Sequence, residues 1–276
     1  MPDDRPIGMF DSGVGGLTVA RAVIDLLPHE DLVYFGDTAR SPYGPRPLSE
    51  IRGFAREIAA FLLDRDVKIL VVACNSVEVA AIEDLTDRSG VPVVGVIDPS
   101  VRAALRATRN GRIGVIGTEA TIRSEAYDRA TRRENGDVRL LGRACAAFVP
   151  HVERGDTTSP ELLARAREYL QPLISAGIDT LIMGCTHYPL LAGLLQEVMG
   201  PEVVLISSAD ETAKDVYAAL VRERLLREDG RSPRHDFLCS GDADAFAALG
   251  RRFLGPEIDE VRPQSVQLAR EGTPWS

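Results

Sequence analysis

Several features that mark particular protein classes are missing from this sequence. No apolar run approaches the roughly 20 residues that a membrane-spanning helix requires. No C-x-x-C pair occurs among the four cysteines, which argues against a zinc ribbon and a thioredoxin-type redox site. Lysine is scarce: Lys68 and Lys214 are the only two, and neither lies in a motif that would suit a Schiff base. These absences argue against a membrane protein and against the common zinc, redox and lysine-linked sites.

Charge and the first residues bear on partners and location. The formal net charge is −9, so the chain has no overall basic character that would favour nucleic acid, and nucleic acid is an unlikely partner. The segment Met1–Pro6 is acidic and leads directly into an apolar run, unlike a secretory signal peptide. We expect a cytoplasmic protein whose four cysteines are free thiols in reducing surroundings.

Short β-rich segments alternate with helical segments along the chain. This order is typical of an α/β protein with parallel sheets flanked by helices. Asp242 is the expected N-cap of the last helix. Strands are predicted at residues 7–10, 32–36, 69–73, 93–97, 113–117, 138–142, 180–183 and 203–207. Helices are predicted at residues 15–27, 49–65, 77–89, 100–109, 121–134, 160–176, 189–199, 209–228 and 243–253.

A weak internal repeat predicts two similar lobes. Ile7-Gly-Met-Phe-Asp-Ser-Gly13 resembles Ile113-Gly-Val-Ile-Gly-Thr-Glu119, and two cysteine-containing segments recur at a similar offset. We place a crossover near residues 98–99 and a return near residues 207–210. The first lobe is then expected to hold residues 1–98 plus 209–276, the second residues 99–208, with a cleft between them.

The strongest chemical signal is a pair of cysteines at the ends of predicted strands. Cys74 ends the run Ile69–Ala73, and Cys185 ends the run Leu181–Gly184. Ligands bind at the carboxyl ends of strands in open α/β sheets. A thiol at the start of a helix is expected to have a pKa below its usual value of about 8.5. Two such thiols across one ligand could remove a proton from one face of a carbon and return it to the other, which is racemisation.

Other candidate residues lie in turns and loops. Asp11 begins a glycine-rich strand-to-helix turn that lacks the G-x-G-x-x-G dinucleotide spacing. Tyr43-Gly44 lies in a long polar loop whose backbone amides could hold a carboxylate. Glu153 is expected in a loop as a solvated charge. Structural roles are expected for Cys145 and Cys239, and solvent exposure for His29 and His235.

At this point four motifs identify a resemblance to glutamate racemases. Asp-Ser-Gly-Val-Gly-Gly, Gly-Asp-Thr-Ala-Arg with Pro-Tyr-Gly, Ala-Cys-Asn-Ser and Gly-Cys-Thr-His-Tyr-Pro-Leu-Leu occur in the order seen in that family, from about residue 7 to 255. The resemblance implies interconversion of L- and D-glutamate without a cofactor or a metal, supplying D-glutamate for peptidoglycan. It also implies two α/β lobes with the substrate between them.

The same resemblance assigns roles to residues. Cys74 and Cys185 correspond to the two catalytic acid/bases, and Asp11 and His187 to groups that assist the thiols. Relatives are often homodimers, and some bind a DNA topoisomerase, so both are possible partners by analogy. The substrate-binding pairs are Asp11-Ser12, Tyr43-Gly44, Asn75-Ser76 and Thr186-His187, with Asp37 and Glu153 as auxiliary carboxylates.

One departure and two alternatives accompany this interpretation. The family usually has small residues after Cys-Asn-Ser, whereas this chain has Val77-Glu78. A carboxylate beside Cys74 would raise the thiol pKa and repel an anionic substrate, so Glu78 is expected to point away and meet an arginine. The alternatives are an aspartate or related racemase of the same superfamily and a binding protein for acidic amino acids without catalysis.

Overall fold

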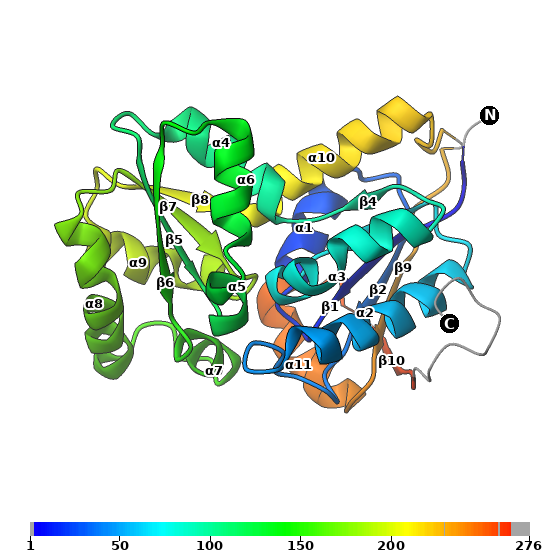
Figure 1. Cartoon of the computed structure of the whole chain (residues 1–276). Coiled ribbons are helices and arrows are strands. Elements are labelled where there is room, and N and C mark those ends of the chain that lie inside the picture. Colours follow the sequence, from blue (N-terminus) through cyan, green and yellow to red (C-terminus); the bar gives the residue numbers. More distant parts are fainter. Residues whose placement is uncertain (1–2, 229, 259, 266–276) are drawn as a thin grey trace.

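The computed structural model describes residues 3–228, 230–258 and 260–265. Two α/β lobes lie side by side, each built on a parallel sheet (Figure 1). The fold class predicted from the sequence is therefore confirmed. The first sheet has the order β10-β9-β2-β1-β3-β4, with β1 (Ile7–Asp11), β2 (Leu32–Gly36), β3 (Ile69–Val72), β4 (Val93–Val94), β9 (His235–Cys239) and β10 (Val261–Pro263). The second has the order β6-β5-β7-β8, with β5 (Arg112–Gly117), β6 (Arg139–Ala144), β7 (Thr180–Gly184) and β8 (Val204–Ser207).

Helices cover both sheets. The first lobe carries α1 (Leu17–Leu26), α2 (Leu48–Leu63), α3 (Asn75–Arg88) and α11 (Ala243–Leu254). The second lobe carries α4 (Ile97–Ala107), α5 (Glu119–Arg123), α6 (Ala126–Glu134), α7 (Phe148–Glu153), α8 (Pro160–Ser175) and α9 (Ala192–Met199), the last preceded by a 3₁₀ turn, Tyr188–Leu191. The long helix α10 (Ser208–Glu223) packs against α1 in one lobe and α4 in the other (Figure 1).

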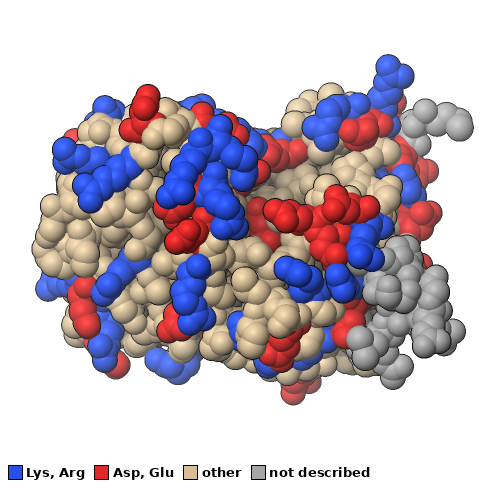
Figure 2. Space-filling model, viewed as in Figure 1, with Lys and Arg blue, Asp and Glu red and all other residues tan. Residues whose placement is uncertain are grey.

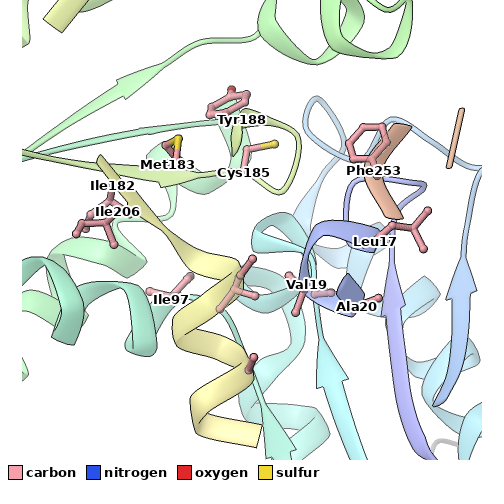
Figure 3. Packing of buried hydrophobic residues seen from close by; sticks show 14 of the residues in the cluster. Leu17, Val19, Ala20, Ile97, Ile182, Met183, Cys185, Tyr188, Ile206 and Phe253 are labelled. Carbon is pink, nitrogen blue, oxygen red and sulfur yellow. The ribbon is translucent and has the colours of Figure 1, made fainter. Parts of the chain in front are cut away.

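The period-2 alternation of strand side chains divides the first sheet between two cores. Ile7 and Met9 of β1 point into the core shared with α1 and α10, while Phe10 points into the core under α2 and α3. Burial on both faces explains why these strands read as continuous apolar runs. The larger core also continues into the second lobe, and Figure 3 shows part of it, with Leu17 and Val19 on the first-lobe side and Ile182, Met183 and Tyr188 on the other.

The two lobes repeat one strand order. The order β2-β1-β3-β4 in the first sheet matches β6-β5-β7-β8 in the second. Cys74 follows β3 and Cys185 follows β7, so the two thiols occupy equivalent positions in the two lobes. The weak repeat in the sequence thus corresponds to a repeat in topology. The exact lobe boundaries at residues 98 and 208 stay a prediction.

Several element predictions were wrong. Residues 93–97 are a strand only at Val93–Val94, because α4 already begins at Ile97. The single helix predicted over 121–134 is two helices, since Glu125 adopts a left-handed conformation with φ 54°. Residues 148–153 form α7 rather than a loop, and β9 and β10 were not predicted. The Asp242 cap is confirmed, because its Oδ1 accepts a hydrogen bond from Ala245 N at 2.9 Å.

Basic and acidic side chains are interspersed over the face shown in Figure 2. Mixed charge of this kind is an ordinary solvated surface. Among the described residues, no helix combines the length and the apolar character that crossing a membrane would need.

Candidate active site

A small cavity opens where the carboxyl ends of both sheets meet, and both predicted cysteines line it. Its volume is about 240 Å³. Cys74 contributes from the first lobe and Cys185 from the second, and each residue is only 6% exposed. The predicted residues Ser12, Tyr43, Gly44, Asn75, Ser76, Glu153, Thr186 and His187 also line it. Asp11 and Asp37 lie behind its wall rather than in it.

Cys74 is the N-cap residue of α3, at the point where β3 ends. Its Sγ lies 3.6 Å from Ser12 Oγ. Burial raises the pKa of the Cys74 thiol, and the nearby carboxylate of Asp11 adds to the rise. The expectation that a helix start would lower this pKa was wrong, because desolvation and a negative neighbour outweigh the backbone hydrogen bonds that act in the opposite direction.

Cys185 belongs to a chain of polar groups in the second lobe. Its Sγ lies 3.9 Å from His187 Nδ1, and His187 Nε2 lies 3.1 Å from Glu153 Oε1. Burial by itself would lower the pKa of His187, but the hydrogen bonds to Cys185 and Glu153 outweigh it and raise the pKa to about 10. The imidazole is therefore cationic at neutral pH and sits between a sulfur and a carboxylate. Glu153 was expected to be a solvated loop charge. Its side chain is 38% exposed, but it ends α7 rather than lying in a loop, and its carboxylate contacts His187.

Asp11 links the two lobes directly behind the sulfur atoms. It is the last residue of β1, and its Oδ1 accepts a hydrogen bond from Gly13 N at 2.7 Å. Its Oδ2 accepts one from Thr186 Oγ1 at 3.3 Å. Burial raises the pKa of Asp11, while His187 and the backbone amides oppose the rise. The carboxyl group thus supports Thr186 and His187 instead of forming the cavity surface.

Close approach of the lobes explains a glycine in the turn after Asp11. A Cβ atom on Gly15 would lie 2.4 Å from Thr186 Oγ1 and 2.5 Å from His187 Nδ1. Both distances are too short for any side chain, so only glycine lets this turn reach the second lobe. The glycine-rich spacing therefore serves packing between the lobes around the cavity.

Asp37 holds the Tyr43-Gly44 wall from behind. It is fully buried, and its carboxylate accepts hydrogen bonds from Tyr43 Oη, from Arg40 Nε at 2.6 Å and from Ser240 Oγ at 2.6 Å. Burial raises the pKa of Tyr43, and the adjacent Asp37 carboxylate raises it further. The hydroxyl therefore stays protonated and donates to Asp37. The auxiliary role suggested for Asp37 becomes one of support for a cavity wall.

The first turn of α3 supplies polar groups that reach toward the second lobe. Asn75 Nδ2 donates to Tyr127 Oη at 2.8 Å, and Ser76 Oγ lies 3.0 Å from Thr118 Oγ1. Asn75 Oδ1 is buried and has no hydrogen-bond partner among the described residues. A buried amide oxygen without a hydrogen-bond donor destabilises the folded protein unless a ligand supplies the donor.

Sequence reasoning missed part of the lining. Thr118 occupies the position in the second lobe that Ser12 occupies in the first, so the internal repeat carried a signal for it. Val149 and Pro150 line the cavity because residues 148–153 form a helix that was not predicted. The additional lining residues are Ser41, Pro42, Pro45, Thr118, Glu119, Ala146, Val149 and Pro150.

Four further residues for which the sequence predicted burial or exposure lie outside the cavity. Cys145 and Cys239 are buried away from it, in keeping with structural roles. His29 is exposed as expected, but His235 is only partly exposed because it begins β9 beside β2. Within the part of the chain that the structure describes, no group of three or more His, Cys, Asp or Glu side chains is arranged to hold a metal.

Two thiols at equivalent strand ends lie with polar groups in one cavity between two α/β lobes. This arrangement defines a class of protein suited to moving a proton from one face of a small molecule to the other. The chain belongs to the Asp/Glu/Hydantoin racemase family, whose model matches residues 17–216. It is therefore related to isomerases.

Several individual relatives of this chain are glutamate racemases. The chain is 57% identical to the glutamate racemase of Beutenbergia cavernae over 97% of this chain and 95% of that protein. Its fold matches a Francisella tularensis glutamate racemase in complex with D-glutamate, with a TM-score of 0.90 and 34% identity, covering 95% of this chain and 98% of that one. A Thermus thermophilus glutamate racemase in complex with beta-chloro-D-alanine matches with a TM-score of 0.86 and 46% identity, covering 96% and 98%.

Proposed function

We propose that this protein interconverts L- and D-glutamate, with Cys74 and Cys185 as the two acid/bases. The observation that carries the proposal is that both thiols line one cavity of about 240 Å³, each from the equivalent strand end of its own lobe. Inversion of a stereocentre by proton transfer needs one group on each face of the carbon. A pair related by the repeat of the two lobes meets that requirement.

The surroundings of the two sulfur atoms give them different starting states. Cys185 lies against the cationic imidazole of His187, which can stabilise a thiolate. Cys74 lies near Asp11, and its raised pKa keeps it a neutral thiol. We therefore infer that Cys74 gives a proton in the resting enzyme, and that His187 supports the negative charge on Cys185 when this residue acts as the base.

The reaction balances without any other reactant. The Cys185 thiolate takes the α-proton of one enantiomer, and the electron pair of the broken C–H bond remains on the substrate. The Cys74 thiol then delivers its proton to the opposite face, which leaves Cys74 as thiolate and Cys185 as thiol. The opposite enantiomer reacts by the reverse path. By family analogy, Cys185 acts on L-glutamate and Cys74 on D-glutamate.

The proposal also assigns the groups that hold the substrate. Asn75 lines the cavity, and we assign its side-chain amide to the substrate ammonium. The Tyr43-Gly44 wall, Ser76 and Thr186 offer backbone and hydroxyl donors to carboxylates. Donors of this kind also stabilise the negative charge that develops as the α-proton leaves.

One experiment tests reaction and substrate together. Each enantiomer of glutamate is incubated with the protein in D2O without pyridoxal phosphate, while optical rotation and α-deuterium content are followed. Racemisation with deuterium uptake is expected from either enantiomer. Faster turnover of D-aspartate would indicate the related aspartate racemase activity. Thermal stabilisation by glutamate without deuterium exchange would indicate a binding protein.

The resemblance extends the proposal to cellular context. The product D-glutamate would serve peptidoglycan synthesis in the cytoplasm. A homodimer is expected by analogy with relatives, and a topoisomerase partner is a further prediction of the same kind. Sedimentation equilibrium would test the first, and co-purification with purified topoisomerase the second.

A further inference from the structure

Glu78 is a buried acid that does not line the cavity but lies on the same helical turn as residues that do. Its side chain is in the first turn of α3, only four residues after Cys74, and the residue is 6% exposed. Its Oε2 accepts hydrogen bonds from the backbone N–H groups of Val96 and, at 3.0 Å, Ile97. The expectation that Glu78 points away from the site is thus met, but its partners are backbone amides rather than an arginine.

These two amides are the first donors of α4, which is the element that carries the chain into the second lobe. The first N–H groups of a helix have no partner within the helix, and a carboxylate there satisfies them and the helix dipole. Helix α4 packs on β7, the strand that ends just before Cys185. Glu78 therefore joins the helix that begins after Cys74 to a helix that rests on the strand of Cys185.

The backbone at Gly95 lies directly against the carboxyl group of Glu78. A Cβ atom on Gly95 would lie 2.4 Å from both Cδ and Oε1 of Glu78, so this position suits only glycine while the carboxylate is in place. Two further contacts of the same turn cross to the second lobe, from Asn75 to Tyr127 and from Ser76 to Thr118. In Figure 1 the start of α3 (cyan) lies beside α5 of the second lobe.

We propose that Glu78 is a positioning residue, which fixes the first turn of α3 against the start of α4 and so holds Cys74 at its working distance from Cys185. The proposal rests on the two-cysteine reaction proposed above. Glu78 itself touches no reacting atom.

Charged groups around Glu78 do not replace its backbone partners. Asp98 of α4 and Arg133 of α6 are the nearby charges, and they pair with each other at 2.7 Å. Tyr127 of α6 is the neighbouring titratable hydroxyl, and it is occupied by Asn75. Burial raises the pKa of Glu78 to about 8, against the opposing effect of the two amides. Either protonation state leaves an oxygen that can accept from Val96 and Ile97.

The test compares two independent ways of displacing the carboxylate. Glu78→Ala removes it, and Gly95→Ala pushes it aside while leaving the glutamate in the chain. Glu78→Gln retains an accepting oxygen and should restore function. The matched controls are Glu83→Ala, an exposed acid on the same helix, and Gly53→Ala, where a Cβ would meet no described atom within 4 Å.

Three readouts are measured on the full chain. We expect Glu78→Ala and Gly95→Ala to lower kcat by about tenfold or more with little change in KM, since small misplacements of a reacting group are costly. The primary isotope effect with α-deuterated D-glutamate should rise, because transfer to Cys74 becomes slower. Amide hydrogen exchange should speed up at Val96 and Ile97. The double variant should be no worse than Glu78→Ala alone, because the methyl group introduced by Gly95→Ala then occupies vacated space.

The outcomes separate this proposal from the one on which it rests. An inactive wild-type protein would overturn the racemase assignment, while exchange at Val96 and Ile97 would still report on the contact of Glu78. Wild-type kcat and isotope effect in a folded Glu78→Ala protein would overturn the positioning role. So would a Glu78→Gln variant as impaired as Glu78→Ala, or a Glu83→Ala control with the same loss.

Discussion

Replacing Glu153 by Gln tests the origin of the cationic state of His187. The His187 Nε2 to Glu153 Oε1 distance is 3.1 Å, and the Glu153 side chain is 38% exposed. The substitution keeps the shape of the side chain and removes its charge. Because an anionic acceptor favours the imidazolium, its loss should lower the pKa of His187.

The exposure of Glu153 sets the size of the effect. A hydrogen bond between charged groups contributes about 1.5–3 kcal/mol when sheltered, but solvent screening at a partly exposed pair reduces this to roughly 1 kcal/mol. At about 1.4 kcal/mol per pH unit, the pKa of His187 should fall by roughly 0.7. The remaining elevation comes from Cys185 and Asp11, which the substitution does not touch. If the transition state loses the same stabilisation of roughly 1 kcal/mol, kcat should fall about fivefold.

The assay is ¹⁵N NMR of labelled imidazole side chains between pH 7 and 11, with racemisation followed in parallel. Glu119→Gln is the matched control, because Glu119 lines the same cavity and its ion-pair partner is Arg123 rather than His187. An unchanged His187 titration in Glu153→Gln would refute the reasoning. An equal fall in Glu119→Gln would show that charge in the cavity, rather than the hydrogen bond, governs His187.

Three further predictions follow from the same structure. Cys74→Ala and Cys185→Ala should each abolish racemisation as measured by polarimetry, and near-normal turnover in either would exclude the two-base scheme. Lys68→Ala should lower the free energy of unfolding by about 3 kcal/mol in a urea titration, because it strands the buried Glu30 carboxylate, whereas exposed Lys214→Ala should have little effect. The pKa of Glu78 is raised in the folded state from 4.5 to about 8, so its contribution to stability is full below pH 4.5 and is lost as the pH rises through 8. Relative to Glu78→Gln, the wild type should therefore lose stability by a slope approaching about 1.4 kcal/mol per pH unit in that interval, and parallel curves for the two proteins would contradict the burial argument.

Much of the architecture could be predicted because it depends on local periodicity. Continuous apolar runs such as Ile69–Val72 and Thr180–Gly184 indicate strands buried on both faces, and the turn residues between them set the alternation with helices. The repeat between residues 7–13 and 113–119 reflects a real repeat of strand order. The wrongly predicted elements lie where a tertiary contact decides whether a segment forms a strand or a helix. Residues 95–97 read as strand by composition, yet Glu78 satisfies the first amides of a helix there.

The sequence by itself determined the kinds of groups available and their places at strand ends, including both thiols, Asn75, Thr186 and His187. Only the tertiary structure decided their electrostatic states. Burial and the Asp11 carboxylate raise the pKa of Cys74. Burial by itself would lower the pKa of His187, but Cys185, together with Glu153 and Asp11 from distant segments, raises it to about 10. Spacing along a chain fixes which side chains share a strand or a helical turn, whereas desolvation and charge pairing depend on which segments meet in space.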